Sequence, residues 1–164
     1  MKMKKFIPLG TALLSALTLI SLFFDYMKVT VPILGEAGEG KVATIGDNSI
    51  LSGDLDNLPD AIKTSRILYI AVLILSVIII AIAVLNFLGI GGKNVGYAFI
   101  GTTVVTFILA LIATILLFRT ETIVFIETKY TPELAPWWAT ITSFLAMLST
   151  GNVLLGNKKS RKKK

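Results

Sequence analysis

Four long stretches of the chain are apolar and free of charged side chains, and polar segments separate them. They cover residues 6–24, 67–90, 95–118 and 137–156. A hydrocarbon core about 30 Å thick is crossed by about 20 apolar residues in a helix, because lipid cannot satisfy exposed backbone groups. The pattern predicts an all-α transmembrane four-helix bundle, formed by one membrane domain over residues 1–157 and followed by a basic tail over 158–164.

The first apolar stretch also has features of a secretory signal peptide. Three lysines precede it, at positions 2, 4 and 5, but its apolar core continues to Phe24 and then meets Asp25-Tyr-Met. No small-x-small cleavage site lies beside that junction. We therefore expect an uncleaved signal anchor, with a cleaved signal peptide as the alternative.

The first outer loop, residues 25–66, predicts a β-hairpin. Polar and apolar residues alternate over 28–31 and 41–45, and the glycine-rich segment Gly35–Gly40 between them predicts the turn. A lone hairpin is only marginally stable in water. A third strand over Thr122–Thr128, from the second outer loop at 119–136, would complete a small extracytoplasmic β-sheet cap.

Turn and capping residues predict where two of the helices begin. Asn57-Leu-Pro-Asp60 fits a helix start near Leu58, with Asn57 as the N-cap and Asp60 at the third helical position. In the second outer loop, Pro132 and Pro136 are expected to end the strand before Trp137.

The distribution of charge predicts the orientation. Ten basic and no acidic residues lie in the N-terminal segment, the short loop with Lys93 and the tail, whereas the two outer loops hold six basic and ten acidic residues. Basic residues near span ends stay cytoplasmic. We expect a multi-pass protein of a prokaryotic cell membrane with both termini in the cytoplasm. The basic termini would lie beside anionic lipid headgroups, so the net charge of +6 does not indicate nucleic-acid binding.

The composition excludes several kinds of chemistry. The chain contains no Cys and no His, which removes thiol nucleophiles, thiolate zinc sites and the commonest general base. The apolar stretches hold no ionisable group, which argues against a coupled transporter or an intramembrane protease. We expect a protein that is not an enzyme, with no cofactor and no metal.

Two segments resemble ligand-binding motifs and depart from them. The acidic cluster of the first outer loop fails the calcium-loop pattern at Leu58 and Pro59, and a solvated acidic surface is the preferred interpretation over a cation site. The cluster consists of Asp47, Asp54, Asp56 and Asp60. The segment 89–96 lacks the first glycine of a phosphate-binding loop, and Asn94 follows Lys93, so we expect a tight cytoplasmic turn.

Small and hydroxyl residues recur at helical spacing within the apolar stretches. The set predicted to pack helices comprises Thr102, Thr106, Ala110, Thr114, Ala139, Ser143 and Ala146, and Ala98, Thr150, Thr11, Ser15 and Thr18 extend the pattern. Small residues let helix backbones approach closely in lipid. Packing within one bundle is the main interpretation, and an oligomer seam or a polar conduit are the alternatives.

Aromatic residues flank the apolar stretches, as in the interface belts of membrane proteins. Tyr26, Tyr69, Trp137 and Trp138 are predicted to anchor the outer boundary, and Tyr97 the inner one.

The order of segments resembles the claudin-like tetraspan layout, in topology only. The claudin first-loop motif, Trp-x-x-Gly-Leu-Trp followed by two Cys, is absent because the loop has neither residue type. The sequences Phe23-Phe-Asp-Tyr-Met-Lys-Val and Pro136-Trp-Trp-Ala are similar to those of small prokaryotic four-span membrane proteins of unknown function. The resemblance implies a topology and no activity.

These observations favour a non-enzymatic integral membrane protein that acts as a partner-binding scaffold or as an accessory subunit of a membrane complex. The partner would be another membrane protein or further copies of the chain. Two alternatives stay open: a small oligomeric channel or exporter component, and an immunity-type protein against a membrane-active toxin.

Overall fold

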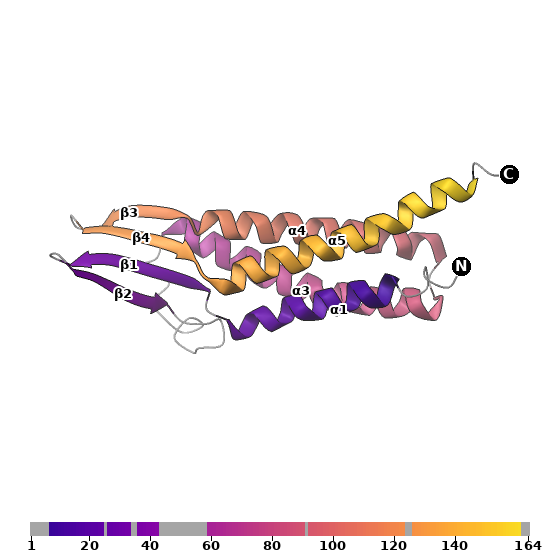
Figure 1. Ribbon diagram of the computed structural model, residues 1–164, viewed down its shortest axis with the longest axis horizontal. Coiled ribbons are helices and arrows are strands. Elements are labelled where there is room, and N and C mark those ends of the chain that lie inside the picture. The colour runs from indigo at the N-terminus through magenta and orange to yellow at the C-terminus, as the bar shows by residue number, and fades with distance from the viewer. Residues whose placement is uncertain are drawn as a thin grey trace.

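The computed structural model describes residues 7–24, 26–33, 36–42, 59–90, 92–123 and 126–161. They form four α-helices: α1 (Ile7–Ile20), α3 (Asp60–Leu88), α4 (Gly92–Leu116) and α5 (Leu134–Arg161), with a short 3-10 helix, η2 (Ser21–Phe23), after α1. The helices lie side by side, each packs against the next along the chain, and α5 closes the ring against α1 (Figure 1). The short connection between α3, which ends at Leu88, and α4, which begins at Gly92, favours an antiparallel pair.

The buried positions of α3 and α4 repeat every three or four residues. On α3 they are Ile62, Ser65, Tyr69, Val72, Leu73, Ser76, Ile79 and Ala83, and on α4 they are Phe99, Thr103, Thr106, Ala110, Ala113 and Thr114, with Leu117 directly after the helix. This alternation averages 3.5 residues per turn, which keeps one narrow stripe facing the neighbouring helices when helices cross at about 20°. The rest of each helix surface points outward.

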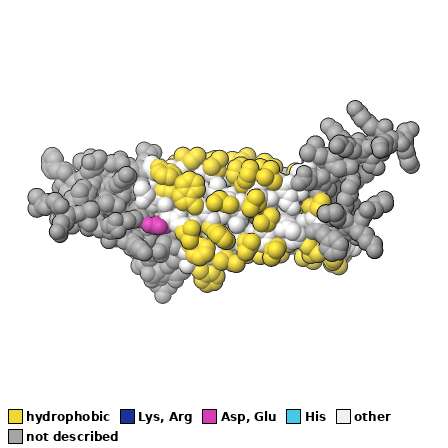
Figure 2. All heavy atoms as spheres, viewed as in Figure 1, with side chains coloured by type: hydrophobic (Ala, Val, Ile, Leu, Met, Phe, Trp, Pro, Cys, Tyr) yellow, Lys and Arg dark blue, Asp and Glu magenta, His cyan; other side chains and the backbone are white. Residues whose placement is uncertain are grey.

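Two helices are long and apolar enough to cross a membrane, by length and composition: Asp60–Leu88 and Val95–Leu116. The shorter helix Ile7–Ile20 is also apolar. Large hydrophobic side chains are exposed on all four helices, among them Leu13, Ile67, Ile115 and Ile141. Figure 2 shows hydrophobic side chains along the middle of the bundle on the face in view.

Helix α3 begins at Asp60, and its N-cap is Pro59 rather than Asn57, which lies outside the described residues. The prediction that placed Asp60 at the third helical position is therefore wrong. The carbonyl of Pro59, in extended geometry, accepts the first hydrogen bonds of the helix, from the amides of Ile62 at 2.9 Å and Lys63 at 3.1 Å. Pro59, as the N-cap, forms no side-chain cap hydrogen bond, whereas the sequence predicted a side-chain cap from Asn57.

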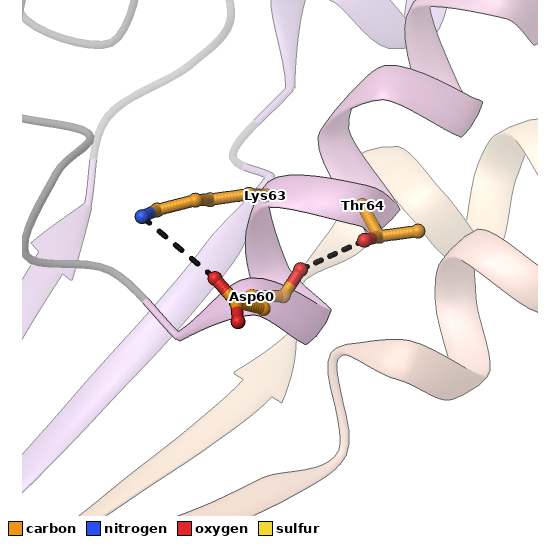
Figure 3. A network of polar contacts seen from close by, with 3 residues as sticks. All are labelled: Asp60, Lys63 and Thr64. Carbon is orange, nitrogen blue, oxygen red and sulfur yellow. Dashed lines mark hydrogen bonds and ion pairs between the residues drawn. The ribbon is translucent and has the colours of Figure 1, made fainter.

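The first turn of α3 carries a small polar network (Figure 3). Lys63 Nζ lies 3.9 Å from Asp60 Oδ1, and the hydroxyl of Thr64 donates to the Asp60 carbonyl at 2.8 Å. The Asp60 carboxylate also lies at the positive end of the helix dipole. At the other end of α3, Gly89 adopts φ +76°, a left-handed conformation that glycine takes without steric cost, and this ends the helix before α4.

Helix α5 is longer than the predicted span at both ends. Pro136 lies within its first turn, which corrects the prediction that this residue separates the strand from the helix. Proline fits there because the first amides of a helix have no acceptor within the helix. The helix continues to Arg161, so the predicted basic tail begins as helix. Conversely, α1 gives way to the 3-10 helix at Ser21, before the predicted end at Phe24.

Four strands lie beyond one end of the bundle, opposite the end where α1 begins and α5 ends (Figure 1). They are β1 (Met27–Ile33), β2 (Glu36–Val42), β3 (Arg119–Ile123) and β4 (Ile126–Pro132), antiparallel in the order β2-β1-β4-β3. Val29 pairs with Gly40 on one side and with Tyr130 on the other. The amide of Glu133 donates to the Tyr26 carbonyl at 3.1 Å, which joins the beginnings of β1 and α5.

Two local predictions in this region are wrong. Residues 36–40 of the glycine-rich segment belong to β2 rather than to a turn, since β1 ends at Ile33 and β2 begins at Glu36. Residues 122–128 do not form one strand, because β3 ends at Ile123 and β4 begins at Ile126, and these two residues pair. Residues 122–128 include several consecutive apolar and β-branched positions. Polar and apolar residues therefore do not alternate regularly there, and the sequence pattern could not locate the turn.

Candidate functional site

Two buried tyrosines form the centre of the bundle where it meets the strands. The rings of Tyr26 and Tyr69 lie 4.9 Å apart at 52°, and both side chains are almost completely buried. The Ser65 hydroxyl donates to the Ala113 carbonyl of α4 at 2.6 Å, which uses its single hydrogen. Tyr26 is therefore the donor in the 2.6 Å hydrogen bond to Ser65 Oγ.

A second chain of hydroxyl groups starts at Tyr69 and crosses to the other helices. Tyr69 donates to Ser21 Oγ at 2.5 Å, and Ser21 donates to the Thr18 carbonyl at 2.5 Å. The Thr18 and Thr142 hydroxyls lie 2.8 Å apart, which links α1 to α5. We call Tyr26, Tyr69, Ser21 and Ser65 the tyrosine–serine cluster, and through it and its acceptors all four α-helices are connected.

The environment of the cluster favours neutral, hydrogen-bonded phenols. Burial raises the pKa of Tyr26 above its ordinary value of 10, while the Ser65 hydrogen bond and the charge of Arg66 act in the opposite direction and are smaller effects. Tyr26 consequently stays protonated at neutral pH and serves as a hydrogen-bond donor. The arrangement stabilises helix contacts through hydrogen bonds between α3, α4 and the segment before β1.

Further hydroxyl pairs join helices along the length of the bundle. Thr114 and Thr140 lie 2.9 Å apart, and each also donates toward carbonyls of Ala110 or Pro136. Nearer the other end, Thr103 meets Thr150 at 3.0 Å, and Thr11 donates to Ser149 at 3.1 Å. Hydrogen bonds between helices in lipid contribute about 0.6–2 kcal/mol each.

An indole ring also joins α5 to α1. Trp138 donates from Nε1 to the Leu17 carbonyl at 2.8 Å, and its ring meets Phe24 edge-on with centroids 5.6 Å apart. The neighbouring Trp137 is exposed and contacts Phe118 edge-on at 6.1 Å. The tryptophan pair therefore divides its roles, one ring packing within the bundle and the other facing outward.

Most of the residues predicted to pack helices are buried, and one is not. The buried ones are Thr106, Ala110, Thr114, Ala139, Ser143 and Ala146. Thr102 is half-buried and donates to Ala98 of its own helix, whereas Thr103, which the sequence analysis missed, faces the interior. Positions four apart rotate about 40° per step on a helix of 3.6 residues per turn, so a ladder of fours leaves the buried stripe.

The predicted outer anchors are divided between surface and interior. Tyr26 and Tyr69 point into the bundle, which does not fit a role at the lipid interface, because α3 presents Tyr69 on its buried stripe. Trp137 is exposed and Trp138 is half-buried. The sequence pattern did not predict that the residues of the tyrosine–serine cluster lie together. The heptad spacing of Ile62, Ser65 and Tyr69 could have indicated that these three face the same side of α3.

Within the described residues no three His, Cys, Asp or Glu side chains gather as metal ligands. Asp47, Asp54 and Asp56 of the acidic cluster lie outside those residues, so the solvated acidic surface preferred over a cation site stays a prediction. Comparison of the chain with protein-family models, with curated proteins and with solved structures found no match in any of the three.

Proposed function

We propose that this chain is a non-enzymatic integral membrane protein with four membrane spans, which acts as a scaffold or accessory subunit for a partner in the membrane. The observation that carries the proposal is the placement of polar and apolar side chains. Serine and threonine hydroxyls lie buried between the helices, while large hydrophobic side chains lie on the outside of the described bundle. Lipid is the environment in which this arrangement is stable.

The low burial of the two longest apolar helices supports the same proposal. In the most apolar part of Asp60–Leu88 only 28% of the residues are buried in the structure, and in Val95–Leu116 only 33%. The central helix of a soluble protein would be mostly buried by its own chain. A lipid environment would cover the remaining apolar surface.

Two features support partner binding over transport or catalysis. The buried hydroxyls are engaged in hydrogen bonds within and between helices, which favours packing over a water-filled conduit through a single bundle. Beyond the bundle, β2 and β3 are the edge strands of the described sheet, and edge strands offer backbone groups for pairing with another chain. A sheet that caps the outer end of the bundle would present this surface outside the membrane.

The proposed topology predicts opposite labelling of two engineered cysteines. The chain has no cysteine, so Ser49→Cys and Ser160→Cys each introduce a single thiol. In intact cells, a membrane-impermeant maleimide should label position 49 and leave position 160 unlabelled until the cells are permeabilised. The expected cause is retention of the basic tail in the cytoplasm. Labelling of position 160 alone in intact cells would refute the orientation.

The oligomeric state tests the scaffold proposal. A stoichiometric foreign subunit that stays with the chain in mild detergent, measured by native mass spectrometry, is the expected result. A homo-oligomer that conducts ions when reconstituted into liposomes would instead contradict the accessory role in favour of a channel.

A further inference from the structure

Two buried side-chain atoms in the described part of the chain have no hydrogen-bond partner, Arg66 Nη1 and Asn86 Nδ2. Both belong to α3. They are separated by 20 residues, which corresponds to about 30 Å along a helix that rises 1.5 Å per residue. That separation matches the thickness of a bilayer hydrocarbon core, about 30 Å.

Between these two positions the polar side chains of α3 are satisfied. Tyr69 donates to Ser21, and Ser76 donates to the Val72 carbonyl of its own helix. The unpaired donors therefore lie at the two depths where a bilayer supplies phosphate and ester oxygens. Inside the hydrocarbon layer, where no acceptor is available, the hydroxyl donors of α3 find partners within the protein.

Arg66 is the charged member of the pair, and it lies beside the tyrosine–serine cluster. Its charge acts on Tyr26, and the adjacent Ser65 contacts both Tyr26 and α4. The Tyr26 hydroxyl donates to Ser65 and the Ser65 hydroxyl donates to the Ala113 carbonyl, while Nη1 of the neighbouring Arg66 has no hydrogen-bond partner. Arg66 is half-buried, and a buried N–H of a cation that lacks an acceptor is unfavourable. A guanidinium matches phosphate oxygens in a bidentate manner.

We propose that Arg66 binds a phosphate group at the end of the bundle next to the strands, with a phospholipid headgroup or free phosphate as its source. The lipid source rests on the proposed membrane function, whereas phosphate binding itself does not. Asn86, a neutral amide at the opposite end of α3, would by the same argument face ester or phosphate oxygens of the other leaflet. The proposal concerns Arg66, because only this residue carries a charge complementary to phosphate.

The test uses the full-length protein purified in a maltoside detergent, with thermal unfolding as the readout. In one arm, short-chain phosphatidylglycerol is titrated against a maltoside-only control, and in the other, inorganic phosphate is titrated against chloride at equal ionic strength. The wild type should show a saturable rise of the melting temperature in at least one arm. A response to the lipid alone identifies a headgroup, and a response to inorganic phosphate alone identifies a free anion.

Three variants make the test specific to the guanidinium. Arg66→Gln should raise the ligand concentration at half-saturation by about tenfold or more. This is the loss of affinity expected for one charge-assisted hydrogen bond. Arg66→Lys keeps the positive charge but lacks the planar guanidinium. Its half-saturation concentration should lie between those of Arg66→Gln and the wild type. Lys63→Gln, one turn earlier on α3, is the matched control and should bind as the wild type does.

Four results would overturn the proposal: no response of the wild type in either arm, an unchanged response of Arg66→Gln, an Arg66→Lys variant equal to the wild type, or an equal loss in Lys63→Gln. The last would indicate diffuse surface charge. Circular dichroism of each variant before titration confirms folding. If Arg66→Gln does not fold, the response of Arg66→Lys is compared with that of the wild type instead. Failure of the proposed function is a separate result, namely a protein that stays soluble without detergent and does not float with liposomes.

Discussion

Replacement of Tyr69 by alanine should lower the free energy of unfolding by about 3–5 kcal/mol, the range for removal of a fully buried aromatic side chain. Tyr69 is 1% exposed, its ring packs on Tyr26, and its hydroxyl donates to Ser21. The substitution removes this packing at the junction of α3, η2 and β1. Thermal unfolding in detergent, followed by circular dichroism, measures the effect.

Two further variants separate the ring from the hydroxyl. Tyr69→Phe keeps the ring and leaves Ser21 Oγ without its donor, so the expected cost is about 1 kcal/mol. Tyr97→Ala removes a tyrosine that is 66% exposed and should leave the melting temperature within a degree or two of the wild type, because about 0.5 kcal/mol is typical of surface changes. Equal melting temperatures for Tyr69→Ala and Tyr97→Ala would contradict the central role of the tyrosine–serine cluster.

Replacement of Ala110 by leucine should destabilise the contact between α4 and α5 by about 1–3 kcal/mol or disrupt assembly, since three extra carbon atoms enter a close-packed site. Ala110 is 1% exposed, and its carbonyl accepts the hydroxyls of Thr114 and Thr140. A leucine side chain would push the two backbones apart and lengthen the hydrogen bond from Thr140 of α5 to the Ala110 carbonyl. The melting temperature and the elution volume in detergent report both outcomes.

The same helix provides matched controls for Ala110→Leu. Ala98→Leu makes an identical chemical change on the exposed side of α4, and Ile108→Leu changes an exposed side chain that is 46% accessible. Both should be tolerated, because an outward-facing position accepts either side chain. If Ala110→Leu and Ala98→Leu behaved alike, Ala110 would not lie at a helix contact.

The sequence alone located the apolar helices well and their ends less well. The stretches 67–90 and 95–118 correspond to the two helices that are long and apolar enough to cross a membrane. The sequence located these helices because each stretch is continuously apolar and contains no charged residue. The beginnings of α3 and α5 differ from prediction, since Pro59 rather than Asn57 is the N-cap of α3 and Pro136 is accommodated in the first turn of α5.

What the sequence by itself determined is therefore the number and position of apolar segments, the absence of Cys and His chemistry, and the division of charge between segments. The tertiary structure decided which side of each helix faces its neighbours. Helices α3 and α4 are apolar on all sides, so hydrophobic periodicity could not distinguish inside from outside. Only packing against the other helices fixed the rotation that buries Thr103 instead of Thr102 and that brings Tyr26, Ser65 and Tyr69 together.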